Sequence, residues 1–180
     1  DPKYPQQRWH YEMINLPQAW EITKGSADVT VAVLDSGVFR HTDLVENLLP
    51  GYDFVEFDVN GDGDLVPDSD PSDPGSNNIG ERTSHGTHVA GTVSARGDNL
   101  KGVSGVSWNT KILPVRVLAA DPRYGFSSFS LKGMEYAAGL LPNLQPPKKA
   151  DVINLSLSLG DKCDAHTQDV IDRVLFVPFP

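Results

Sequence analysis

Two short motifs place an acid and a histidine in settings suited to catalysis. Asp35 follows the apolar run 29–34 and precedes a serine and a glycine. His85 opens the segment 85–92, HGTHVAGT, whose glycines allow a helix to pack closely against neighbouring backbone. A carboxylate can accept the imidazole N–H, fix its tautomer and stabilise the imidazolium that forms when the ring takes a proton. Asp35 and His85 are therefore candidates for the support and the general base of a hydrolase.

Each motif also has a plainer interpretation. The triplet Asp35-Ser36-Gly37 is, by itself, typical of a turn, because all three residue types favour one. His88 lies one helical turn after His85 and could complete a metal pair, but we expect a packed, hydrogen-bonded histidine there. A metal hydrolase would also need a third ligand, and no residue stands at a convincing spacing.

The elements that must position these residues follow from hydrophobic patterning. Continuous β-branched and apolar runs predict strands buried on both faces of a parallel sheet, and residues three and four apart predict amphipathic helices between them. A proline at position 114 indicates the start of a strand or a bulge. The expected strands are 29–34, 112–118 and 152–157, and the expected helices are 85–95, 127–141 and 165–175.

This alternation of strand and helix predicts the α/β class. We expect a doubly wound, mostly parallel sheet with helices on both faces and right-handed crossovers. Active sites in such folds form beyond the carboxyl ends of the strands. Asp35 stands at such an end.

An acidic stretch has the spacing of a calcium loop. Oxygen-bearing side chains occupy alternate positions from residue 58 onward, and Gly63 takes the sixth position, as in an EF-hand. The twelfth position is Ser69 instead of glutamate, so the bidentate ligand is either missing or supplied by Asp68 or Asp70; a solvated acidic loop is the alternative. The candidate Ca²⁺ ligands are Asp58, Asn60, Asp62, Asp64, Asp68 and Asp70.

Composition narrows the class of partner. The 180 residues carry a formal net charge of −9, which argues against nucleic acid and favours a cationic ligand. No apolar run approaches the roughly 18 residues that cross a bilayer, so we expect no membrane partner.

The chain opens Asp1-Pro2-Lys3, which is typical of a processed N-terminus and not of a signal peptide. The single Cys163 is either a buried free thiol or half of a disulfide with another chain.

Taken together, the two motifs resemble a known family. Residues 31–37 (VAVLDSG) and 85–92 (HGTHVAGT) are similar to the Asp and His signatures of the subtilisin-like serine proteases, and they occur in that family's order. The likeness continues through residues 102–118 and 151–157. It implies a secreted, calcium-binding serine endopeptidase that acts on proteins or peptides. It also implies that residues 1–180 are the N-terminal part of a single catalytic domain, cut short.

The resemblance also implies a nucleophile that we do not find. In this family the serine lies well downstream, in a Gly-Thr-Ser-Met-Ala-like stretch that starts a helix, and residues 1–180 contain no such stretch. We therefore expect the serine outside this chain, either on a second, C-terminal chain or in a part of the molecule beyond these residues, and we expect the chain alone to be inactive. The alternative is a catalytically inactive, truncated module that binds calcium or peptide.

Substrate and further metal contacts rest on the resemblance alone. Ser156, Leu157 and Ser158 resemble the edge segment that pairs with an extended peptide, although 158–160 is an alternative register. Tyr124 is either a wall of an apolar pocket or a plain surface aromatic. A second calcium site of the family type would join Asp1, Asp43 and either Asp98 or Asn99.

Overall fold

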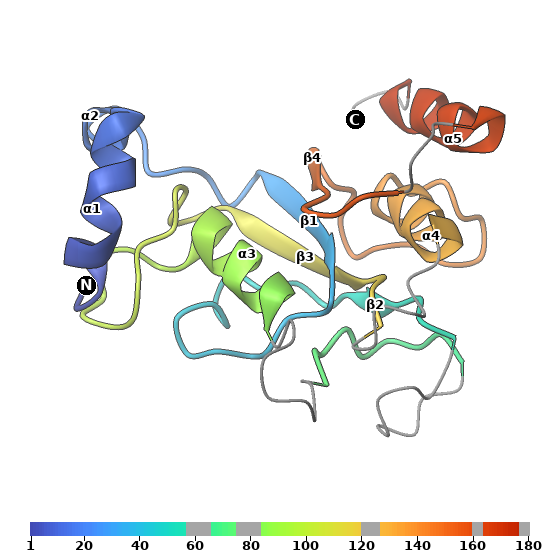
Figure 1. The fold of residues 1–180 in the computed structure, drawn as a ribbon, viewed down its shortest axis with the longest axis horizontal. Helices are drawn as coiled ribbons and strands as arrows, with labels where there is room; N and C mark the ends of the chain where they lie inside the picture. The colour runs from blue at the N-terminus through green and yellow to red at the C-terminus, as the bar shows by residue number, and fades with distance from the viewer. Residues whose placement is uncertain (57–65, 75–83, 120–126, 160–163, 177–180) are drawn as a thin grey trace.

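The fold is built on a four-stranded parallel sheet (Figure 1). The computed structural model describes residues 1–56, 66–74, 84–119, 127–159 and 164–176. The order of the strands across the sheet is β2-β3-β1-β4, and because all of them run parallel, every connection is a crossover. The strands are β1 (Thr30–Asp35), β2 (Tyr52–Asp53), β3 (Lys111–Arg116) and β4 (Val152–Asn154).

The central strand β1 shows why the chain folds in layers. All six of its residues are buried, and successive side chains point to opposite faces of the sheet. Val31 and Val33 pack in the apolar cluster that contains Ala90 of α3 (His85–Ser94). Ala32 and Leu34 pack in the cluster on the other face. One strand therefore supplies both halves of the core, and helices cover both faces.

The remaining helices lie around this sheet. The helix α4 (Ser127–Ala137) packs on the face opposite α3, and α5 (Ala165–Leu175) packs against α4. The helices α1 (Tyr4–Met13) and α2 (Leu16–Trp20) lie at the end of the molecule away from α5 (Figure 1). No helix within the described ranges is long and apolar enough to cross a bilayer.

Pro114 lies inside β3, not at a strand start or bulge as expected. The backbone groups of Ile112 and Arg116 form hydrogen bonds on the side of the sheet where β2 lies. Alternate residues of a parallel strand bond to the same side, so the backbone nitrogen of Pro114 faces β2 as well. Pairing with β2 begins only at Val115, and Gly51 lies directly against Pro114. The ring therefore costs the sheet no hydrogen bond with β1.

The expectation that β4 is buried on both faces is wrong. Val152 is 52% exposed because β4 is the edge of the described sheet and pairs only with β1 there. The strand ends at Asn154, three residues before the expected end. The helix expected over 127–141 ends at Ala137, where the left-handed Gly139 (φ +69°) follows. The helix expected over 165–175 has the predicted bounds.

Candidate active site

Asp35 and His85 meet at the carboxyl end of β1. The Nδ1 atom of His85 lies 2.7 Å from Oδ1 of Asp35, and the same oxygen accepts the backbone N–H of Ser36 at 2.7 Å. The Asp35 side chain is fully buried, whereas that of His85 is 43% exposed. A carboxylate can only accept, so Nδ1 carries the proton and Nε2 is left with a free lone pair. This arrangement fixes the His85 ring through Nδ1 and leaves the half-exposed ring able to accept a proton at Nε2.

Close backbone packing brings the two residues together. A Cβ on Gly86 would lie 2.3 Å from the carbonyl oxygen of Gly37 and 3.0 Å from Cβ of Asp35, so only glycine fits there. Gly37 itself has a φ of +103°, a left-handed conformation that glycine adopts without strain. The first turn of α3 can therefore lie directly against the end of β1.

A second buried acid lies beside the pair. The Ser36 hydroxyl lies 2.7 Å from Oδ2 of Asp73 and accepts the backbone N–H of Gly86 at 3.1 Å. Both side chains are almost fully buried. We did not predict this contact, because a buried polar pair 37 residues apart leaves no periodic signal in the sequence.

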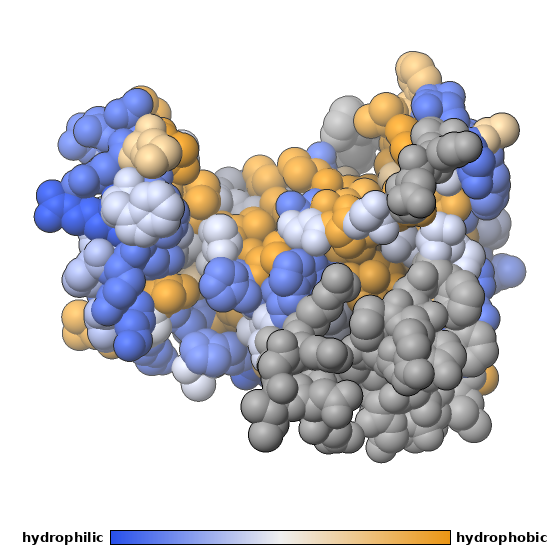
Figure 2. Space-filling view, in the orientation of Figure 1, coloured by the Kyte–Doolittle hydropathy of each residue, from blue (hydrophilic) through white to orange (hydrophobic). Residues whose placement is uncertain are grey.

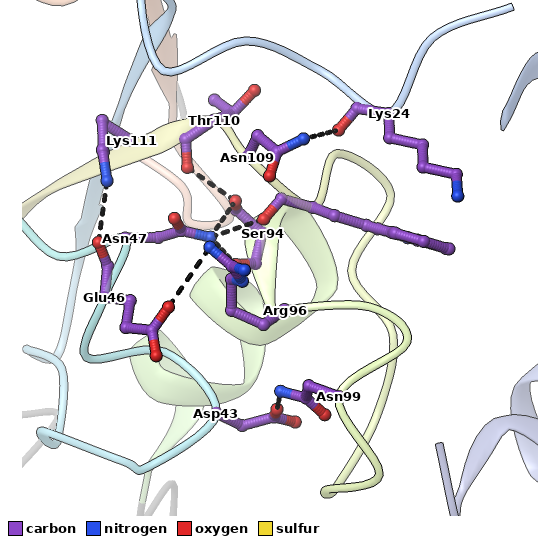
Figure 3. Close-up of polar contacts among 11 residues, drawn as sticks. Lys24, Asp43, Glu46, Asn47, Ser94, Arg96, Asn99, Asn109, Thr110 and Lys111 are labelled. Atoms are coloured by element: carbon purple, nitrogen blue, oxygen red, sulfur yellow. Dashed lines mark hydrogen bonds and ion pairs between the residues drawn. The ribbon is translucent and has the colours of Figure 1, made fainter.

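A buried amide fixes the far end of α3 (Figure 3). The amide nitrogen of Asn47 donates to the carbonyl oxygens of Ser94 at 2.9 Å and of Trp108 at 2.8 Å. The Ser94 hydroxyl lies 2.6 Å from the carbonyl oxygen of Thr110. These bonds tie α3 to the segment before β3, so the helix that carries His85 is held at both ends.

A buried ion pair lies one strand away from Asp35. Arg116 is the register partner of Asp35 in β3, and its guanidinium contacts Oδ2 of Asp53 at 2.6 Å, with both side chains 2% exposed. Burial raises the pKa of Asp53 to about 6, against the opposing effects of Arg116 and of the N–H of Val55. The sequence contained no signal for this pair either, since its partners come from different strands.

The predicted substrate segment lies at the exposed edge of the sheet. Ser156, Leu157 and Ser158 follow β4; both serines are exposed and Leu157 is half-buried. The side chain of Asn154 donates to Ser156 Oγ at 3.0 Å. Tyr124 lies outside the described residues, so its assignment stays a prediction.

Only part of the predicted calcium loop falls within the described residues. Asp58, Asn60, Asp62 and Asp64 lie outside them. Asp68 and Asp70 follow, and each carboxylate accepts a backbone N–H two residues on, at 2.6 Å and 3.0 Å. Whether these residues bind calcium stays a prediction.

Residues of the second predicted calcium site contact one another, and whether they bind calcium stays a prediction. Asp43 is 1% exposed, and its carboxylate accepts the side-chain amide of Asn99 at 2.6 Å and the N–H of Val103 at 2.9 Å. The Asp1 carboxylate accepts the N–H groups of Asp98 and Asn99, whereas Asp98 is itself exposed. Across the described ranges, no three His, Cys, Asp or Glu side chains are grouped as for a metal. The side-chain oxygen of Asn99 instead accepts the N–H of Lys101 at 2.8 Å.

His88 differs from the expectation of a packed histidine. It lies on the exposed side of α3, and its backbone N–H bonds to the carbonyl oxygen of Ser84 at 2.8 Å, closing the first turn. A metal pair with His85 gains no support, since no third ligand is grouped with them among the described residues.

Comparison with known proteins identifies the family. The sequence profile of the peptidase S8 family, described as the subtilase family, matches residues 26–176. The chain therefore belongs to the subtilase family, and the resemblance noted in the sequence is confirmed. Because the described fold is an α/β sheet with helices on both faces, the expected fold class is confirmed as well.

Similar proteins cover the chain almost completely, but the chain covers only part of them. It is 36% identical to the extracellular basic protease of Dichelobacter nodosus, over 96% of this chain and 31% of that protein. It is 39% identical to the thermophilic serine proteinase of Bacillus sp. strain AK1, over 87% of this chain and 31% of that protein. A solved protease of Pseudoalteromonas arctica PAMC 21717 superposes with a TM-score of 0.85 at 39% identity, over 97% of this chain and 55% of that one. The chain thus spans about a third of the length of these curated relatives.

Proposed function

We propose that this chain supplies the acid and the base of a serine endopeptidase. The observation that carries the proposal is the 2.7 Å contact between buried Asp35 and half-exposed His85, in a chain of the subtilase family. Relatives that are named proteases or serine proteinases support the same activity. In this proposal the nucleophilic serine lies outside residues 1–180, because no stretch of the expected kind occurs within them.

The proposed mechanism assigns one task to each residue. His85 takes the proton of the serine hydroxyl at Nε2 while the serine oxygen attacks the peptide carbonyl, and it then returns the proton to the leaving amine. Asp35 keeps the Nδ1 proton in place and stabilises the imidazolium. The burial of Asp35 keeps water from competing for this hydrogen bond.

The proposed substrate is an extended stretch of protein chain. The edge of β4, which pairs only with β1 among the described residues, and the segment 156–158 with its two exposed serines support strand addition. Figure 2 shows hydrophobic residues at the surface in the hollow between the N-terminal helices and α5. We assign residues 1–180 to the N-terminal part of one catalytic domain, whose remainder would cover part of this surface.

We also propose that the protein binds calcium and acts outside the cell. Asp1, Asp43 and Asn99 would hold one ion, with the Asn99 amide turned so that its oxygen faces the metal. A buried Asp43 carboxylate whose two described partners are neutral N–H donors suits a divalent cation. Calcium would stabilise the loop 98–104 and would take no part in the chemistry. The extracellular setting is supported by the names of several relatives.

Active-site labelling tests the proposed function. A fluorophosphonate probe should label the protease that contains this chain at a serine outside residues 1–180, and His85→Ala should abolish the labelling. The 180-residue chain by itself should remain unlabelled, since loss of the serine in this type of enzyme costs on the order of 10⁶-fold in turnover. Labelling of a serine between residues 1 and 180 would refute the proposal, and absence of labelling in the complete protein would favour the inactive module.

A further inference from the structure

A chain of hydrogen bonds links Asp73 to the helix that carries His85. The backbone N–H of Gly86 donates to Ser36 Oγ at 3.1 Å, and Ser36 Oγ lies 2.7 Å from Oδ2 of Asp73. A hydroxyl has one proton, and a carboxylate can only accept. The Ser36 proton therefore points to Asp73, which leaves an oxygen lone pair for Gly86. Asp73 thus determines the orientation of the Ser36 hydroxyl.

Ser36 also contacts the other half of the catalytic pair. Its backbone N–H donates to Oδ1 of Asp35, the same oxygen that receives the His85 proton. The side chain of Ser36 is bound to the residue after His85, and its backbone is bound to Asp35. A rotation or shift of Ser36 would therefore move the two catalytic residues relative to each other.

The segment that carries Asp73 packs closely against the loop after Asp35. The carbonyl oxygen of Pro71 accepts the N–H of Val38 at 3.0 Å. A Cβ on Gly37 would lie 2.7 Å from the backbone nitrogen of Asp73 and from the carbonyl oxygen of Pro71. Segment 71–73 is therefore seated directly on the loop that follows Asp35.

The other end of this segment is tied to the sheet. Asp53 of β2 and Asp68 exchange two backbone hydrogen bonds, at 2.8 Å and 3.1 Å. The carboxylates of Asp68 and Asp70 each close a tight turn toward residue 72. Residues 68–73 thus run from β2 to the carboxyl end of β1 and place the buried Asp73 carboxylate there.

We propose that Asp73 is a positioning residue that acts through Ser36 to hold His85 in line with Asp35. This inference rests on the proposed function, since it assigns a role within the same site. In this role Asp73 acts through its contact with Ser36 and takes no part in the proton transfer itself. Its effect is geometric: a displacement of about 1 Å in a catalytic group can cost on the order of 100-fold in rate.

Kinetics of the complete protease with a peptide substrate provide the first test. Asp73→Asn keeps the shape of the side chain but weakens the acceptor, and it should lower kcat roughly 10-fold to 100-fold with KM nearly unchanged. Ser36→Ala, which removes only the hydroxyl, should lower kcat by a similar factor. The double variant should be no worse than either single one, because both remove the same link. Ser36→Thr, which retains the hydroxyl, should recover most of the activity.

A spectroscopic measurement distinguishes positioning from general stability. The low-field proton resonance of the His85 Nδ1–H reports the hydrogen bond to Asp35, and Asp73→Asn should shift or broaden it. Asp28→Asn is the matched control: Asp28 accepts a serine hydroxyl at 3.2 Å in an exposed turn before β1, away from the carboxyl end of the strand. This control should leave both kcat and the resonance unchanged.

The outcomes separate this inference from the proposed function. If His85→Ala retains activity, the proposed function fails and the inference fails with it. If His85→Ala is inactive while Asp73→Asn and Ser36→Ala keep wild-type kcat and resonance, the positioning role alone is refuted. Additive losses in the double variant, with an unshifted resonance, would also refute it. If Asp73→Asn does not fold, the conservative Ser36→Ala and Ser36→Thr variants decide the question by the same kcat and resonance criteria.

Discussion

The buried ion pair between Arg116 and Asp53 should be the polar contact whose disruption costs most stability. We predict that Arg116→Met, which preserves most of the side-chain volume, destabilises the protein by about 3–5 kcal/mol at pH 7.5. The guanidinium of Arg116 lies 2.6 Å from Oδ2 of Asp53, and both side chains are only 2% exposed, so neither charge is solvated by bulk water. Removal of one partner leaves a buried charge with neither water nor a counterion.

The pKa of Asp53 gives the scale and the sign of the pH dependence. Burial raises this pKa from 3.8 to about 6, so ionising Asp53 in the folded state costs about 3 kcal/mol more than in the unfolded chain. A raised pKa means that the folded state binds the proton more tightly. Protonation of Asp53 therefore stabilises the folded state fully below pH 3.8, and this stabilisation is lost as the pH rises through about 6. Without Arg116, which lowers this pKa, the loss should extend to higher pH.

The penalty for Arg116→Met should consequently be smaller in acid. At pH 5 Asp53 is mostly protonated in both proteins, so the variant loses little more than a hydrogen bond, about 1–2 kcal/mol. Urea unfolding at pH 5 and pH 7.5, in a His85→Ala background that prevents self-digestion, measures both values. The matched control is the double variant Asp53→Asn with Arg116→Met, which leaves no buried charge and should recover much of the loss at pH 7.5. A penalty below about 1 kcal/mol at pH 7.5, or one equal at both pH values, would contradict this reasoning.

Three further predictions concern the site and its support. Asp35→Asn should lower kcat by on the order of 10⁴-fold with little change in the melting temperature, because the amide favours the wrong histidine tautomer; an unaffected kcat would remove Asp35 from the mechanism. Gly86→Ala should lower kcat and cost about 1–3 kcal/mol in urea unfolding, since the new Cβ would lie 2.3 Å from a backbone oxygen; equal stability would show that α3 can shift freely. Chelation of calcium should lower the melting temperature. When free calcium is a hundred times its dissociation constant, the bound ion adds about 2.7 kcal/mol to the free energy of unfolding, and chelation removes this contribution. Asp43→Ala should reduce this response, and an unchanged response would place the stabilising ion elsewhere.

The layered fold was predictable because burial leaves a periodic signal. The uninterrupted apolar run of β1 indicated a strand covered on both faces, and the spacing in 165–175 indicated a helix with the bounds that α5 has. The two-residue strand β2 left no such signal, since it is too short for periodicity. The partial exposure of β4 was not predicted either, because an apolar run does not reveal which strand lies at the edge.

The candidate site was predictable only where the chemistry lies in local motifs. Asp35 and His85 stood out because each begins or ends an element within a distinctive run of small residues. Ser36 and Asp73 did not, since their contact depends on how segment 71–73 crosses the end of β1. Buried polar pairs of this kind are set by tertiary packing, which no spacing along the chain encodes.

The central position of β1 has a consequence for the order in which the protein can be made. Thr30 pairs with Lys111, about 80 residues later in the chain, and Val31 pairs with Val152 later still. At a synthesis rate of roughly 5–20 residues per second, β1 waits on the order of 4–16 s for β3 to be synthesised. During that interval an apolar strand that ends in Asp35 has no ladder partner on either side, and Asp35 can acquire its buried setting only after β3 docks. Asp35 is thus synthesised well before the strands that enclose it.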